Sequence, residues 1–165
     1  MKGRVSAMAP LEIKKHPDKI LRKNCEPVRN VTEKEREIFN EMLFTMRHFC
    51  GIGLAAPQVG ISKRLIVASV EDVTIKLANP EILDTSGSDT ISEGCLSVVN
   101  TVIDIKRPTV ITVRGLNEES KIIELKTSGL LARVIQHEID HLNGRLIIDY
   151  MGLIKRLSST LKGAM

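Results

Sequence analysis

The stretch SGLLARVIQHEIDHLNG, residues 128–144, constrains this chain more than any other part of the sequence. Its apolar residues recur at helical spacing between a serine and a glycine, which predicts one amphipathic helix. His137 and His141 are four positions apart, so both imidazoles project from one face and can reach one metal ion. Leu130 and Val134 continue this stripe, which places the histidines beneath a core rather than in bulk water.

Glu138 completes an HExxH motif on this predicted helix. It lies on the shoulder of the histidine face, where a carboxylate can reach a water on the metal without binding the metal itself. The motif is short and also arises by chance, in which case both histidines would be ordinary core or surface residues. The apolar helical context favours the metal site. The other two histidines, His16 and His48, have no partner at ligand spacing, and we expect them to be structural or exposed.

The third metal ligand decides the class of enzyme, because a catalytic zinc-type site takes three protein ligands and keeps one open position. The chain follows the protease motif HExxHxxGxxH as far as Gly144, but Ile147 stands where the last histidine belongs. No glutamate follows Glu138, so a downstream glutamate ligand is excluded. Asp149 is the one remaining acid with which a small metalloprotease could complete its site.

A cysteine offers the upstream alternative for the third ligand. Cys95 lies in SEGCLSV, where Gly94 lets the backbone approach the metal and a loop would give the thiolate access. Cys25 and Cys50 are expected to be small buried apolar residues. Three cysteines cannot all pair within one chain, and no secretory segment opens the sequence, so we expect a cytoplasmic protein.

The glycine stretch GIGLAAPQVG, residues 51–60, imitates a dinucleotide-binding fingerprint, and Asp72 stands about 20 residues on, where a ribose-binding acid is wanted. That fingerprint requires a strand before the glycines and a helix after them. Here the amphipathic segment TEKEREIFNEMLFTMRHF, residues 32–49, predicts a helix before them, begun by a TxxE capping box and ended at Gly51. Pro57 also interrupts the position of the phosphate-binding helix, so dinucleotide binding is rejected.

Strand-like runs fill the space between the two helices and predict a mixed α+β chain. They cover residues 65–70, 74–78, 101–105, 109–114 and 121–125, with a loop expected over 84–94. We expect one domain over residues 1–165, with an N-terminal extension at 1–9 and a C-terminal helix within 150–165. The sequence has no apolar run long enough for a membrane span. Its few aromatic residues and a net charge of +4 give no sign of sequence-specific nucleic-acid binding.

Three motifs in this order, GIGLAAPQ, EGCLS and QHEIDH, resemble the signatures of peptide deformylases, which remove the formyl group from the initiator methionine of nascent chains. PDKILRKNCEPV, ANPEI and SGLLARVIQHEIDHLNG extend the likeness over roughly residues 10–150. The resemblance implies an α+β fold in which antiparallel or mixed β-sheets pack around a central HExxH helix. It also implies a cytoplasmic monomer that acts on N-formyl-methionyl peptides, and it leaves transient ribosome association open.

The resemblance further implies one divalent metal ion, usually Fe²⁺ with Zn²⁺, Ni²⁺ or Co²⁺ as substitutes, held by Cys95, His137 and His141. Water would occupy the fourth position. Glu138 would accept the proton of this water and later protonate the departing amine. The oxyanion would be stabilised by the backbone N–H of Leu96 and the side-chain amide of Gln58.

An extended peptide substrate would lie, by the same resemblance, beside Ile52 and Gly53 on one side and Gly94 on the other. The methionine pocket would be lined by apolar residues with a cation at its lip, namely Ile52, Leu130, Val134 and Arg133, each of which could equally be structural. Asp140 and Glu93 are candidates for hydrogen bonding behind the metal ligands, or for ordinary helix and loop contacts.

The sequence departs from the family pattern just after EGCLS. Many members have proline two residues after the serine and Arg or Tyr a few positions later, whereas this chain has Val99 and Val102, while Arg107 of the IKRP run is retained. The peptide preference beyond methionine is therefore open. A non-catalytic metal-binding module is a further alternative, but a structural metal site would need neither Glu138 nor Gln58.

Overall fold

The computed structural model describes residues 8–152, so the expected C-terminal helix and most of the expected N-terminal extension lie outside the described residues. Within these residues the chain forms two α-helices and seven strands, which in chain order are α1 (Glu33–His48), β1 (Gly53–Ala55), β2 (Leu65–Val70), β3 (Val73–Ser86), β4 (Asp89–Cys95), β5 (Val98–Arg107), β6 (Val110–Leu116), β7 (Ile122–Ser128) and α2 (Gly129–Leu142). Short 3-10 helices cover Lys19–Arg22, Ala56–Val59 and Ile147–Tyr150.

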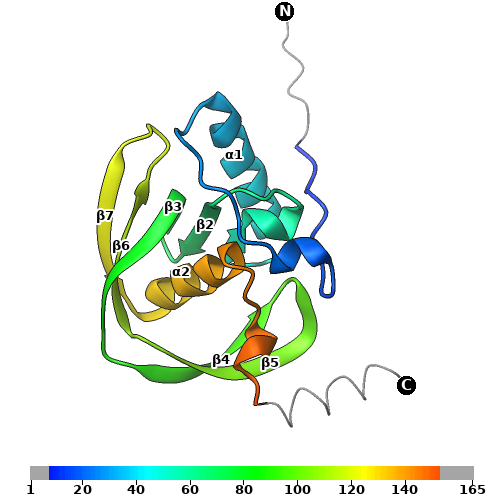
Figure 1. The fold of residues 1–165 in the computed structure, drawn as a ribbon, viewed down its shortest axis with the longest axis vertical. Helices are drawn as coiled ribbons and strands as arrows, with labels where there is room; N and C mark the ends of the chain where they lie inside the picture. Colours follow the sequence, from blue (N-terminus) through cyan, green and yellow to red (C-terminus); the bar gives the residue numbers. More distant parts are fainter. Residues whose placement is uncertain (1–7, 153–165) are drawn as a thin grey trace, which may run out of the picture.

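The strands form two antiparallel sheets around α2. Five strands pair in the order β1-β2-β3-β6-β7, and β4 pairs only with β5 in the second sheet. Figure 1 shows α2 in the centre of the molecule, with β6 and β7 to one side and β4 and β5 below it. The expected α+β class, with sheets packed around the HExxH helix, is confirmed. No helix within residues 8–152 is long and apolar enough to cross a membrane.

Helix α1 begins where the capping pattern predicted. The Glu35 carboxylate accepts a hydrogen bond of 3.0 Å from the backbone N–H of Thr32, which satisfies a donor that the first helical turn leaves unpaired. One face of the helix then buries Phe39, Met42 and Met46 against β1 and β2. This packing places the end of α1, and the glycine stretch that follows, beside the HExxH helix.

Helix α2 is the central element because one of its faces packs against the five-stranded sheet. The stripe with Leu130, Val134 and His137 is a different face and lines a cavity, which corrects the expectation that this stripe lies beneath a core. Buried residues from α2 and from strands β2, β3 and β6 make one core cluster, which includes Ala132, Ile135, Ile139, Leu142, Ile66, Leu77, Ile111 and Val113. Gly129, the first residue of the helix, has a φ of +63°, a conformation that only glycine adopts without strain. The chain can therefore turn sharply from β7 into α2.

The expectation of a loop over residues 84–94 is wrong for most of that range. β3 continues to Ser86, Gly87 turns the chain with a φ of +65°, and β4 begins at Asp89. The segment is polar because nearly all of β4 is exposed, so it lacks the apolar alternation that would have indicated a strand. Pairing with β5 satisfies the backbone groups along one edge of β4, and Ser92 bonds to Asp104 across the two strands.

Two further expectations concern the burial of Cys25 and Cys50 and the residue at which α1 ends. Cys25 is buried as expected, but Cys50 is exposed, which corrects the expectation that both are buried. The helix was expected to end at Gly51, but α1 ends at His48, and Cys50 has a left-handed φ of 57°. A Cβ at Gly51 would lie 3.1 Å from Leu96 Cδ1, so a side chain there would press on the end of the Leu96 side chain.

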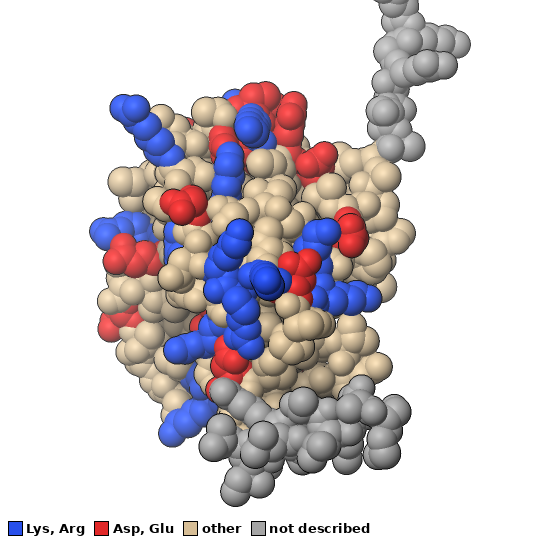
Figure 2. Space-filling model, turned by 45° about the vertical axis from the view of Figure 1, so that its right-hand side comes forward, with Lys and Arg blue, Asp and Glu red and all other residues tan. Residues whose placement is uncertain are grey.

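Charged residues on the surface are mixed in sign. Figure 2 shows Lys and Arg side chains gathered near the middle of one face, with Asp and Glu side chains beside them. Exposed ion pairs such as Arg22 with Asp149 and Arg114 with Glu81 illustrate this mixing. The visible face is therefore not a continuous basic surface.

Candidate metal centre and active-site pocket

Three potential metal ligands from two elements converge behind the active-site pocket. Cys95 is the last residue of β4, and His137 and His141 lie one turn apart on α2. The Sγ atom of Cys95 is 3.3 Å from Nε2 of His141, which is 3.2 Å from Nε2 of His137. The three donor atoms all lie within 4.8 Å of one another.

The donor set fits a four-coordinate metal ion. Ligand bonds of about 2.0–2.3 Å at tetrahedral angles put neighbouring donor atoms about 3.3–3.8 Å apart, close to the separations between Cys95, His141 and His137. Two ring nitrogens that face each other across 3.2 Å beside a thiol are also well placed to share one cation. Asp149 is engaged elsewhere, with Arg22 and the backbone N–H of Leu146, so the Asp149 alternative gains no support.

The two histidine ligands differ in their protonation. Burial lowers the pKa of His141 well below its ordinary value, which favours the neutral imidazole that binds metals. Burial also acts to lower the pKa of His137, but hydrogen bonds with Cys95 and Glu93 outweigh it and raise that pKa to about 10. A metal ion bound at Nε2 of His137 would therefore displace a proton. The other histidines, His16 and His48, are exposed and lie outside the centre.

Glu93, from β4, fixes the orientation of the first histidine. Nδ1 of His137 donates to Glu93 Oε2 over 2.9 Å, which leaves Nε2 facing the centre. The carboxylate also accepts hydrogen bonds from Arg107 Nε and Arg133 Nη1, both at 2.6 Å. Burial acts to raise the pKa of Glu93, but these partners outweigh it and lower the pKa to about 2, so Glu93 is ionised.

Asp140, the other residue expected to form hydrogen bonds behind the metal ligands, is bound by Arg107, which also binds Glu93. Its Oδ2 accepts from Arg107 Nη1 at 2.9 Å and from the Tyr150 hydroxyl at 2.6 Å. Arg107 therefore links Glu93 on β4 to Asp140 on α2. Sequence reasoning retained Arg107 as part of a motif but missed Tyr150, because nothing in the local pattern places a distant tyrosine against this arginine.

Glu138 lies buried at the inner end of the pocket. It is 3% exposed, and its Oε2 atom has no hydrogen-bond partner among the described residues. Burial raises its pKa to about 7, the range in which a carboxyl group both accepts and returns protons near neutral pH. Gly53 passes directly over it, since a Cβ at Gly53 would lie 3.0 Å from Glu138 Cδ and closer still to Oε1.

Gln58 approaches the centre from the opposite side. Its Oε1 accepts from the backbone N–H of Ala55 at 2.9 Å, and its Nε2 donates to Ser97 Oγ at 3.2 Å. This pairing fixes the amide orientation and leaves Nε2 3.7 Å from Cys95 Sγ. Leu96, the other expected oxyanion donor, directly follows Cys95 in the turn between β4 and β5. Ser97 is a residue that sequence reasoning missed.

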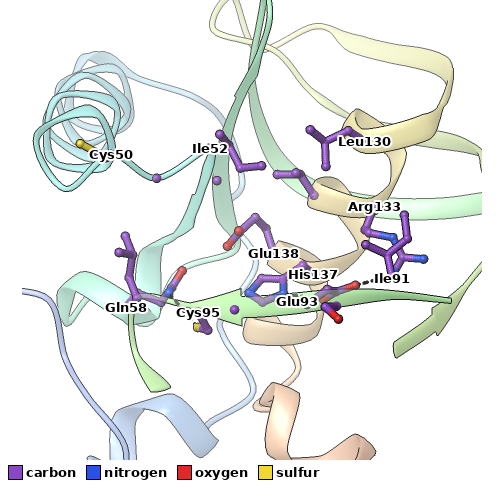
Figure 3. Close-up of a pocket in the computed structure, with 16 residues that line it drawn as sticks. Cys50, Ile52, Gln58, Ile91, Glu93, Cys95, Leu130, Arg133, His137 and Glu138 are labelled. Carbon is purple, nitrogen blue, oxygen red and sulfur yellow. Dashed lines mark hydrogen bonds and ion pairs between the residues drawn. The ribbon is translucent and has the colours of Figure 1, made fainter. Parts of the chain in front are cut away.

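A cavity of about 500 Å³ opens in front of these groups. Figure 3 shows Ile52 on one side, Cys95, Glu93 and Ile91 along β4, and Leu130 on α2 at the mouth, with Glu138 and His137 between them. All the residues that were expected to contact substrate line it, namely Ile52, Gly53, Gly94, Leu130, Arg133 and Val134. The cavity is thus bounded by β1, β4 and α2.

Arg133 lines this cavity, but its guanidinium group is paired with other residues of the protein and does not face the cavity as a free cation. The side chain is 5% exposed, and its guanidinium donates to Glu93, to Asp89 Oδ1 at 2.6 Å and to the carbonyl of Ile105 at 2.9 Å. The expected cation at the lip of the pocket is therefore a buried clamp between α2 and the β4–β5 pair. Sequence reasoning missed Asp89, because this residue is exposed at the start of β4 and nothing in the local pattern pairs it with the buried Arg133.

Comparisons with known proteins agree with this geometry. The profile of the polypeptide deformylase family matches residues 10–157. A peptide deformylase of Hydrogenovibrio crunogenus is 46% identical over 152 residues, covering 90% of each chain. The crystal structure of an Ehrlichia chaffeensis peptide deformylase in complex with actinonin superposes with a TM-score of 0.90 at 37% identity, covering 94% of this chain and 96% of that one. A Legionella pneumophila peptide deformylase gives a TM-score of 0.87 at 39% identity over 93% of both chains. The chain belongs to the peptide deformylase family.

Proposed function

We propose that this chain removes the N-formyl group from the initiator methionine of nascent polypeptides and releases formate, using one divalent metal ion held by Cys95, His137 and His141. One observation carries the proposal: three donor atoms within 4.8 Å of one another lie beside a buried glutamate at the inner end of an apolar cavity. The family membership supports the same reaction. A structural metal site would not need a buried glutamate beside it.

The proposed physiological metal is Fe²⁺, with Zn²⁺, Ni²⁺ or Co²⁺ able to replace it. A thiolate and two imidazoles suit each of these ions, so the donor set is compatible with the proposal. When bound, the ion would supply Lewis-acid chemistry, lowering the pKa of a water molecule towards about 7 and polarising the formyl oxygen.

Glu138 performs the proton transfers in this proposal. Its carboxylate accepts a proton from the attacking water as the new C–O bond forms at the formyl carbon. When the C–N bond breaks, the carboxyl group returns that proton to the departing amine. A pKa near 7 suits both steps, because neither the acid nor the base form is then strongly disfavoured.

Gln58 and Leu96 stabilise the negative charge that develops on the formyl oxygen. The amide of Gln58 is held by Ala55 and Ser97, so its Nε2 needs no reorganisation during the reaction. The backbone N–H of Leu96 provides the second donor in this proposal. Losing one such donor typically costs on the order of a hundredfold or more in kcat.

The peptide lies between two strand edges. β1 is the last strand of the five-stranded sheet and β4 pairs only with β5, so each has one edge without a strand partner among the described residues. An extended peptide can pair with such edges through its backbone, here at Ile52–Gly53 and at Gly94. The methionine side chain then enters the cavity against Leu130 and Val134.

The proposed setting is the cytoplasm. We propose a single-domain monomer over residues 1–165 that meets its substrates as they emerge from the ribosome, with transient ribosome association as part of this setting. The finding that no described helix could cross a membrane is compatible with it.

Formate release from formyl-Met-Ala-Ser tests the proposal, using protein prepared anaerobically with Fe²⁺ and, separately, with Ni²⁺. Turnover is expected with both metals, and fully metallated protein that releases no formate would refute the activity. Glu138→Gln should keep its metal and lose about a hundredfold or more of kcat. The exposed control Glu124→Gln should behave as the wild type.

A further inference from the structure

Tyr150 is the only tyrosine of the chain, and the proposed mechanism does not use it. It ends the 3-10 helix Ile147–Tyr150, which Figure 1 shows beside β4 and β5. Leu146 and Ile147 are buried in a cluster with residues of β5, and Tyr150 packs against the edge of this cluster. The packing fixes the tyrosine ring relative to β5, the strand that carries Arg107.

The side chain of Tyr150 contacts Arg107 in two ways. Its hydroxyl oxygen accepts a hydrogen bond from Arg107 Nη1 at 3.2 Å, and the guanidinium carbon lies 5.1 Å from the centre of the ring. A cation over an aromatic face is attracted by the ring electrons. The hydroxyl also donates to Asp140 Oδ2 over 2.6 Å. Burial and this hydrogen bond raise the pKa of Tyr150, so the hydroxyl stays protonated and able to donate.

Arg107 is shared between two carboxylates. It is 4% exposed, and its Nε and Nη2 donate to the two oxygens of Glu93 at 2.6 and 3.0 Å. This paired contact fixes the plane of the Glu93 carboxylate, whose Oε2 also accepts from Nδ1 of His137. The third donor, Nη1, binds Asp140 Oδ2 at 2.9 Å. The orientation of the imidazole therefore depends on where the guanidinium is held.

The tyrosine hydroxyl limits the pull of Asp140 on this guanidinium. Within residues 8–152, Asp140 Oδ2 accepts side-chain hydrogen bonds from Arg107 and from Tyr150. Without the hydroxyl, the charge of Asp140 would be left to Arg107 alone and would draw the guanidinium away from Glu93. Without the ring, water would reach a guanidinium that is now buried. Either change would loosen the carboxylate that orients His137.

We propose that Tyr150 is a positioning residue of the metal centre, which holds Arg107 in place and through it fixes the orientation of His137. The proposal rests on the metal-dependent function proposed above. Tyr150 belongs neither to the three metal ligands nor to the lining of the active-site cavity, so it acts only through the groups that it holds. Its loss should therefore change how firmly the centre holds a metal ion.

Loss of metal from Co²⁺-loaded protein measures this role without any substrate. The protein is loaded anaerobically, and the visible absorption of the bound ion is followed after a chelator is added. Hydrogen-bond partners behind metal ligands typically change metal affinity by about 10–100-fold, and Tyr150 lies one group further out, so Tyr150→Phe should lose Co²⁺ about tenfold faster than the wild type. Tyr150→Leu, which also lacks the ring, should lose it faster still. The absorption bands of bound Co²⁺ should shift in both variants, because they report the arrangement of the ligands.

Ile147→Val is the matched control for packing. Ile147 is 2% exposed in the same 3-10 helix, and the substitution removes one methylene group without touching the hydrogen bonds of Tyr150. The control should lower the urea concentration at the midpoint of unfolding, because it leaves a small cavity. Its rate of Co²⁺ loss and its absorption bands should match those of the wild type.

The outcomes separate this proposal from the one beneath it. A wild-type rate of Co²⁺ loss with unchanged bands in Tyr150→Phe would overturn the positioning role and leave the deformylase activity standing. Equally fast loss from Ile147→Val would overturn it as well, because packing of the short helix and not the hydroxyl would then be responsible. A wild-type chain that takes up no Co²⁺ would refute the metal centre and the positioning role together. Absence of formate release from wild-type protein that holds its metal would refute the proposed function alone.

Discussion

Gly53→Ala should disable the enzyme through a single added methyl group. A Cβ at this position would lie 2.6 Å from Val134 Cγ1 and 3.0 Å from Glu138 Cδ. Carbon atoms pack best at about 3.5–4.0 Å, so the methyl group overlaps both side chains by roughly 1 Å. Val134 and Glu138 are buried on α2 and line the cavity, so the methyl group would push both side chains towards the cavity and shift the Glu138 carboxylate from its position.

The size of the effect follows from this overlap. Displacing a catalytic group by about 1 Å typically costs about a hundredfold in rate, and overpacking a tight site costs about 1–3 kcal/mol of stability. We therefore expect Gly53→Ala to lower kcat/KM about a hundredfold while the protein stays folded. The metal should be retained, because the three atoms nearest to the new methyl group belong to Glu138 and Val134 and not to Cys95, His137 or His141.

The assay combines formate release from formyl-Met-Ala-Ser, metal analysis of the purified protein and urea unfolding. Gly152→Ala is the control, since a Cβ there would have no heavy atom within 4 Å. If Gly53→Ala kept wild-type kcat/KM, the placement of Glu138 beneath β1 would not matter for catalysis, and its proposed role would be wrong. Loss of metal in the variant would show instead that the site had collapsed as a whole.

Three other perturbations test separate parts of the centre. Burial raises the pKa of Glu138 to about 7, and only the ionised carboxylate accepts a proton, so kcat/KM should rise with pH up to about pH 7. A bound cation lowers the pKa of Glu138 and would move this rise to lower pH, and a pH–rate profile measures its position. Cys95→Ala should lose its metal on dialysis, as metal analysis would show, whereas a protease-like site completed by an acid would retain it. Arg133→Met breaks a buried ion pair with Glu93 and a second pair with the partly exposed Asp89. It should cost about 3 kcal/mol or more in urea unfolding, mainly because Glu93 loses a buried partner, against less than about 1 kcal/mol for the exposed Arg114→Met.

Local pattern in the sequence was sufficient for the two described helices, α1 and α2, and for placing His137 and His141 on one helix face. Residues four apart on a helix share a face whatever surrounds them, so the paired histidines and the glutamate between them could be read directly. The capping box before α1 is equally local, because it depends on two side chains three residues apart. The thiol ligand was an open choice by spacing and became specific through the likeness of EGCLS to a family motif.

Only the tertiary structure decided which groups surround these ligands. Arg133 was expected at the lip of a pocket, but the packing of β4 and β5 against α2 buries its guanidinium against Glu93 and Asp89. The extent of β4 was missed because its side chains are polar and exposed, and its pairing with β5 depends on contacts distant in the sequence.

The glycine stretch shows the same division. The sequence determined that it is not a nucleotide loop, because a helix precedes it and a proline follows. The need for Gly53 appeared only when α2 was packed beneath it, with Glu138 and Val134 where a side chain would be. Periodicity and capping act between neighbours in the chain, whereas pockets, buried ion pairs and the space above a glycine depend on elements that meet only when the chain has folded.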